Sequence, residues 1–172
     1  MAHELYTRTN QKLFYAGLSL ESWRAAQEGR AVNSLALIQA EREAALFHLY
    51  GALLGLCHEI AGYYRLPESN TPRAEQLLDK ALLDAAPSPE LAELIELAQQ
   101  PETWLAQLLQ AYGELFQPPQ AAKKVKVDPR TPLIVAVSLD QEEPPLARET
   151  LEVWRQELKG LAKRFRDSLS EW

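Results

Sequence analysis

The sequence predicts a mainly α protein: a helical bundle of about six helices, with a short β-hairpin or extended segment before the C-terminal helix. Leucine and alanine dominate over β-branched residues in a chain of 172 residues that is 47% hydrophobic, and such a composition favours helices. Apolar residues also recur every three or four positions, in segments bounded by Pro, Gly, Ser, Thr and Asn. We therefore expect a bundle core over residues 1–117, a linker over 118–144 and an amphipathic helix over 145–172, packed on the core.

Two long helices are predicted to open the chain. The first covers residues 5–28, where the apolar spacing is helical and a glycine follows. The second runs from a cap at Asn33 or Ser34 to about residue 64, where turn-forming residues begin. At 1.5 Å per residue it is about 46 Å long, so we expect a kink near Gly51 or Gly55.

Three shorter helices are predicted to follow. Thr71 and Pro72 have the residue types of a helix start, and Leu77, Leu78, Ala81 and Leu82 would form the apolar face of that third helix. Ser88 and Pro89 repeat this start for a fourth helix, whose Glu90, Glu93 and Glu96 are expected to face water. The fifth helix is predicted from Pro101 to about Phe116.

The composition changes after residue 118. Residues 123–127 and 133–139 hold most of the β-branched residues outside the helices, and turn-forming residues separate them, so they could pair as a β-hairpin. The last helix then carries the most regular apolar pattern of the chain. We call this pattern the C-terminal seam: Leu151, Trp154, Leu158, Leu161, Phe165 and Trp172. It either closes the core of the bundle or binds a partner, because such large apolar side chains are costly to leave in water.

The charge distribution argues against binding to nucleic acid. The net charge is −6 for the chain and −7 for residues 1–117, whereas binding to phosphate backbones requires clustered Lys and Arg.

The start of the chain does not resemble a signal peptide. The longest apolar stretch, residues 44–57, is shorter than the roughly 20 residues of a membrane span. With a single cysteine, we expect a cytoplasmic protein that does not enter a membrane.

The second helix contains a polar face within an apolar segment. Glu41, His48 and Glu59 share this face, and Arg8 and Asn10 of the first helix could join them in a candidate polar pocket. These positions extend over about 27 Å, too far apart to hold one metal ion. No Glu-x-x-His pair is present, so we expect no metal and no cofactor.

A second face of the same helix consists mostly of small residues, which would let a neighbouring helix approach closely. These residues are Ala44, Gly51, Gly55, His58 and Gly62. The lone Cys57 is expected to be buried and unreactive.

One local motif suggests an enzyme. Residues 42–50, REAALFHLY, resemble the Arg-x(4 to 6)-His signature of HEPN nucleases, small helical bundles that cut RNA as dimers. The resemblance implies that Arg42 would stabilise phosphate charge, His48 would move a proton or orient the 2′-hydroxyl, and Tyr50 would assist. The chain departs from the family at Glu43, where a small polar residue is usual. Arg42 and His48 are also about 120° apart around an ideal helix, so they meet one substrate only in a distorted helix or with a second subunit.

A second resemblance covers most of the chain. The segments LYTRTNQKLFYAGL, LIQAEREAALFHLYGALLGLCHEIAGYYRLP and WRQELKGLAKRFRDSLSEW are similar to a family of uncharacterised bacterial proteins known only as a domain of unknown function. This resemblance implies a bacterial, cytoplasmic protein and supplies no activity, substrate or catalytic residue.

The sequence therefore favours a noncatalytic protein that acts through protein–protein interaction. Its partner would be an unknown protein or a second copy of the chain. The alternative is a HEPN-like ribonuclease that uses Arg42 and His48.

Overall fold

The computed structural model describes residues 2–118 and 145–170. Within them the chain forms six α-helices, one short 3-10 helix and no strand. The elements are α1 (Ala2–Glu28), α2 (Ser34–Tyr63), η1 (Ala74–Gln76), α3 (Lys80–Ala85), α4 (Pro89–Gln99), α5 (Trp104–Glu114) and α6 (Arg148–Ser170). The predicted mainly α class is confirmed, whereas the predicted hairpin over residues 123–139 lies outside the described residues.

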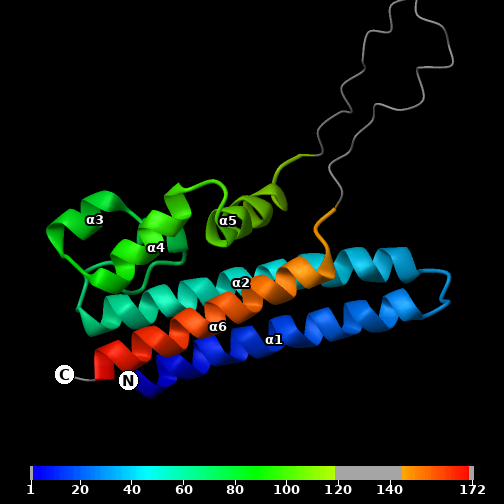
Figure 1. Cartoon of the computed structure of the whole chain (residues 1–172), viewed down its shortest axis with the longest axis horizontal. Helices are drawn as coiled ribbons and strands as arrows, with labels where there is room; N and C mark the ends of the chain where they lie inside the picture. Colours follow the sequence, from blue (N-terminus) through cyan, green and yellow to red (C-terminus); the bar gives the residue numbers. More distant parts are fainter. Residues whose placement is uncertain (1, 119–144, 171–172) are drawn as a thin grey trace, which may run out of the picture.

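The two longest helices form an antiparallel pair that runs the length of the molecule (Figure 1). Helix α6 lies along this pair and contacts both of its members. Helices α4 and α5 pack against α2, and α3 packs against α4. In Figure 1 the start of α1 and the end of α6 lie at the same end of the molecule.

Small residues of α2 allow the close approach of α1. A Cβ atom built on Gly55 would lie 2.6 Å from Oγ1 and 3.2 Å from Cα of Thr9, and one built on Gly51 would lie 3.0 Å from Cδ of Lys12. Both glycines lie within the continuous α2. The small stripe predicted from the sequence is therefore the surface on which α1 packs.

Helix α6 covers the apolar core with the C-terminal seam. Its residues Leu151, Trp154, Leu158, Leu161 and Phe165 are at most 7% exposed, and they pack against the chain's own helices. Trp172 lies outside the described residues. The seam therefore closes the core in this structure, and a partner could reach these five side chains only by displacing α6.

The prediction of a continuous third helix from Thr71 is wrong. Residues 67–70 form turns and Pro72 lies in a bend; η1 and then the short α3 follow. The hydroxyl of Tyr50 on α2 accepts a hydrogen bond from the backbone N–H of Ala74 at 3.0 Å, which ties this segment to α2. A separate cap starts α3, where the side chain of Asp79 accepts from the N–H of Ala81.

The starts of the next two helices follow helix-capping chemistry. The side chain of Ser88 accepts from the N–H of Leu91 and Pro89 opens α4, as predicted. Helix α5 begins at Trp104 with Thr103 as its cap, later than the predicted Pro101. The intervening residues form a turn, because the N–H of Thr103 bonds to the carbonyl of Gln100 at 3.1 Å.

Glu90 is buried, contrary to the prediction that it faces water. Its carboxylate accepts hydrogen bonds from the hydroxyls of Tyr64 at 2.9 Å and Ser168 at 2.8 Å. Burial alone would raise the pKa of Glu90, but the hydrogen bonds from Ser168, the backbone, Tyr64 and Ser88 together lower it. Ser168, which interrupts the apolar spacing of α6, is therefore matched to a buried carboxylate on α4.

Among the described helices, α2 alone is long and apolar enough to cross a membrane by length and composition. Other helices bury 67% of its most apolar window, as expected for the central helix of a bundle.

Candidate functional site

The five residues of the predicted polar pocket do not all share the same contacts. Glu59 forms a bidentate ion pair with Arg166, with Nε–Oε2 and Nη2–Oε1 distances of 2.8 and 2.7 Å. Asn10 joins them by accepting from Nη1 of Arg166 at 3.0 Å. This ion pair raises the pKa of Arg166. Glu59 and Asn10 thus share a partner on α6, Arg166, which the predicted pocket does not contain.

His48 lies elsewhere, between aromatic side chains. Its ring makes edge contacts with Tyr15 and Phe47, at centroid distances of 5.5 and 5.4 Å. Its Nδ1 atom is buried without a hydrogen-bond partner among the described residues. Burial lowers the pKa of His48, and the positive charges of Lys12 and Arg8 lower it further.

The other two members of the predicted pocket remain apart from Glu59. Arg8 is exposed on α1, and Glu41 is half-buried on α2. Neither forms an ion pair with any residue in ranges 2–118 and 145–170. Asn10 and Glu59 therefore meet at Arg166, while His48 faces the aromatic residues and lies within the electrostatic influence of Arg8. A single pocket that joins all five residues stays a prediction.

The residues of the HEPN-like motif also have separate environments. Arg42 donates from Nε to the carbonyl of Leu146 at 3.2 Å, and its guanidinium lies 4.9 Å from the ring centroid of Trp23. It thereby anchors the residues before α6. Its partners differ from those of His48, so the two side chains do not form one site within the chain.

Tyr50 is buried and makes its contacts within the protein interior. Its hydroxyl donates to Oε2 of Glu75 at 2.6 Å, and its ring stacks on Tyr112 at 3.8 Å between centroids. Burial raises the pKa of Tyr50, and Glu75 adds to this effect. A neutral, buried phenol with these partners has a structural role.

Two further kinds of reactive group are a metal-binding cluster and an exposed thiolate, and neither is found among the described residues. In ranges 2–118 and 145–170, no group of three or more His, Cys, Asp or Glu side chains could hold a metal ion. Cys57 is fully buried, and burial raises the pKa of its thiol to about 12. Because the thiolate is the reactive form, Cys57 is a poor nucleophile at neutral pH.

A continuous group of exposed apolar side chains covers part of the α1–α2 pair. We define the aromatic face as Phe14, Tyr15, Leu18, Phe47 and His48. Phe14, Leu18, Phe47 and Tyr15 are 59%, 51%, 50% and 37% exposed. The rings contact in the order Phe14, Tyr15, His48, Phe47, with a centroid distance of 6.4 Å between Phe14 and Tyr15. Side chains of this size are rarely left in contact with water in a group.

Opposite charges flank the aromatic face along the helix pair. Lys12 lies beside Gly51, and its Nζ is 4.8 Å from the ring centroid of Phe47. Burial lowers the pKa of Lys12, as does the nearby charge of Arg8. Glu43 is exposed on α2, eight positions before Gly51 and so about 12 Å away along the helix. Among the described residues, Lys12 and Glu43 form no ion pair.

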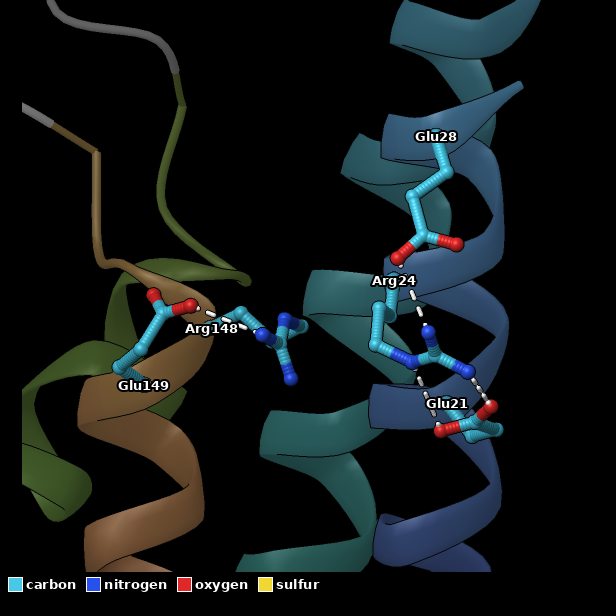
Figure 2. Close-up of polar contacts among 5 residues, drawn as sticks. All are labelled: Glu21, Arg24, Glu28, Arg148 and Glu149. Carbon is cyan, nitrogen blue, oxygen red and sulfur yellow. Dashed lines mark hydrogen bonds and ion pairs between the residues drawn. The ribbon is translucent and has the colours of Figure 1, made fainter.

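Charged residues near the distal end of α1 have local partners instead. Figure 2 shows Arg24 between Glu21 and Glu28 of the same helix, with 2.9 Å from its Nη1 to Oε1 of Glu28. It also shows Arg148 paired with Glu149 at the start of α6, at 2.9 Å. Within the described part of the chain, these charged residues therefore form local ion pairs, unlike Lys12 and Glu43 beside the aromatic face.

The aromatic face is not predicted from the sequence, because Phe14 and Leu18 recur at helical spacing beside Leu13 and Leu20 and match the pattern of core residues. Leu13 and Leu20 of the same helix are indeed buried. The signal available in the sequence was the width of the apolar surface of α1. It extends over more of the helix circumference than two packed neighbours can cover.

The comparison with known families gives one result. The family model described as "Family of unknown function (DUF6586)" matches residues 1–172, so the chain belongs to this family. No curated protein and no solved structure matches the chain.

Proposed function

We propose that this protein is noncatalytic and acts by binding a second copy of itself through the aromatic face. The observation that carries the proposal is the continuous exposure of Phe14, Tyr15, Leu18 and Phe47. Clusters of this kind on a folded domain are typical of interaction sites. A cytoplasmic location is part of the proposal, in keeping with the lone cysteine.

The dispersal of reactive groups supports a noncatalytic role. Arg42, His48 and Tyr50 have different partners, and Cys57 is a buried thiol. Catalysis requires groups that converge on one reacting atom. The ribonuclease alternative, which uses Arg42 and His48, therefore gains no support from the arrangement within one chain.

Charge complementarity favours a second copy as the partner. A two-fold interface brings one surface of a protein against the same surface of its copy. Phe47 lies midway along α2 between Glu43 and Gly51, the residue beside Lys12. We place the two-fold axis near Phe47, so that α2 of one copy runs antiparallel to α2 of the other. This arrangement would place Arg8 and Lys12 of one copy close to Glu43 and Glu41 of the other. The same axis would bring the two Phe47 rings together.

The oligomeric state of the full chain tests this proposal. We expect sedimentation equilibrium to show a reversible dimer, and we expect Phe47→Ser to weaken dimerisation at least about tenfold by removing a central aromatic anchor. Phe116→Ser is the matched control, because Phe116 is 69% exposed but lies after α5, outside the aromatic face. The control should dimerise like the wild type.

A charge exchange tests the antiparallel arrangement. Arg8→Glu and Glu43→Arg should each weaken the dimer, whereas the double variant should regain most of the affinity because it restores opposite charges across the axis. Circular dichroism would verify that each variant is folded. A wild type that stays monomeric up to millimolar concentration, or a dimer that Phe47→Ser leaves unchanged, would overturn the proposal.

A further inference from the structure

A hollow separate from the aromatic face lies where α1 begins and α2 ends. Its volume is about 310 Å³, at the lower end of the range for small-molecule pockets. Residues 4–6 of α1 and four residues from the last two turns of α2 form most of its wall, and Ser69 and Asn70 complete it. We call this hollow the end pocket.

The charge of the end pocket is negative. Its lining includes the carboxylates of Glu4 and Glu59 and contains no Lys or Arg. Arg166 neutralises Glu59, and the same guanidinium also donates to Asn10 and lies 4.6 Å from the ring centroid of Tyr6. Glu4 has no ion-pair partner in the described part of the chain. An anionic ligand would therefore meet an uncompensated carboxylate.

The remaining wall combines apolar surface with hydrogen-bond acceptors. Leu5 and the rings of Tyr6 and Tyr63 supply the apolar part, and Tyr63 is 45% exposed. Ser69 and Asn70 also line the pocket, and the side chains of both residue types carry an oxygen that can accept a hydrogen bond. Nε2 of His58 lies 2.7 Å from the carbonyl oxygen of Thr71. Because a carbonyl oxygen only accepts hydrogen bonds, Nε2 is the donor, and its N–H is not available to a ligand.

We propose that the end pocket binds a small organic molecule with a primary ammonium group and an apolar body. The ammonium has three N–H donors and a positive charge, which suit Glu4 and the oxygens of Ser69 and Asn70. The apolar body packs against Leu5 and the ring of Tyr63, and an ammonium close to this ring gains a cation–π attraction. Ligand charge, and not only ligand shape, sets the preference of the pocket.

Three probes of one shape but different charge test the proposal. Benzylamine, benzyl alcohol and benzoate are titrated into the full chain, and amide chemical shifts are followed by NMR. We expect benzylamine to bind, with shifts concentrated at Leu5, Gly62 and Ser69. We expect weaker binding of benzyl alcohol and none of benzoate. Tyr63→Ala should lower the affinity for benzylamine, because it removes the exposed ring.

A pair of charge-neutralising variants separates a local effect from the overall charge of the protein. Glu4→Gln should lower the affinity for benzylamine about two- to fivefold, as expected for the loss of an exposed ion pair. Glu28→Gln changes the net charge equally at the other end of α1, about 36 Å away, and should have no effect. Absence of benzylamine binding, equal binding of benzyl alcohol, or equal effects of Glu4→Gln and Glu28→Gln would overturn the proposal. None of these outcomes depends on whether the chain forms a dimer.

Discussion

The two sides of the α1–α2 pair use similar residue types in opposite ways. Where α6 covers the pair, Glu59 is buried and its charge is met by Arg166. On the aromatic face, Lys12 and Phe47 contact each other, but no carboxylate forms an ion pair with Lys12 within the described residues. The first arrangement holds the fold together. In the second, Lys12 is 9% exposed, and it is the aromatic surface that is available to a partner. Residue type alone therefore does not separate structural from functional positions in this chain.

The largest effect is expected on the covered side, at the Glu59–Arg166 pair. Glu59→Ala should lower the free energy of unfolding by about 3–5 kcal/mol, because it leaves a largely buried guanidinium without its carboxylate. Urea denaturation measures this loss. Glu93→Ala is the control: Glu93 also pairs with an arginine of α6, Arg164, but the two side chains are 37% and 57% exposed, compared with 2% and 20% for Glu59 and Arg166. Its removal should cost less than about 1 kcal/mol. Equal losses for the two variants would contradict the contrast between the covered and the exposed regions.

An intermediate effect is expected from apolar truncation on the two sides. Leu158→Ala should destabilise the monomer by about 2–5 kcal/mol, since Leu158 of α6 is fully buried in the core and its loss leaves a cavity. Phe14→Ala should change monomer stability by about 0.5 kcal/mol or less, because the ring of Phe14 is 59% exposed. Both values come from thermal or urea unfolding at concentrations low enough to keep the chain monomeric. A loss for Phe14→Ala as large as that for Leu158→Ala would mean that the aromatic face belongs to the core.

The smallest effect concerns the pH dependence of stability. The pKa of Glu90 is lower in the folded chain than its ordinary value of 4.5. The unfolded chain therefore binds this proton first, and the stabilisation is present above about pH 4.5 and lost as the pH falls through the folded pKa. Glu90→Gln should be less stable than the wild type at pH 7, and the difference should shrink as the pH falls below 4.5. Urea unfolding over this range measures it, and a difference independent of pH would show that the charge of Glu90 is not stabilising.

Local patterns predicted much of the fold. Helical spacing over residues 5–28 and 34–64 corresponds to α1 and α2, and Ser88 with Pro89 starts α4 as expected. The stripe of small residues on α2 was also recognised as a surface for close packing. Each of these features depends on residues within a few turns of one another, so the sequence contains the whole signal.

The predictions that were wrong involve contacts between distant segments. Thr71 and Pro72 have the residue types of a helix start, yet contacts with Tyr50 and other residues of α2 hold the segment in turns. Glu90 has the spacing of an exposed residue, but hydroxyls from Tyr64 and Ser168 make its burial favourable. A stretch of sequence does not record which distant side chains will supply such partners.

The sequence by itself determined the helical class of this protein, the extent of its long helices and the apolar seam of α6, because spacing and capping act along the chain. Only the tertiary structure decided that Arg166 pairs with Glu59, that Arg42 and His48 face different surroundings, and that Phe14 and Phe47 remain exposed. The physical reason is that burial and pairing are set by the neighbours that a side chain meets. Arg42 and Glu59 meet partners more than 100 positions away in the sequence. Within ranges 2–118 and 145–170, no helix covers Phe14 and Phe47.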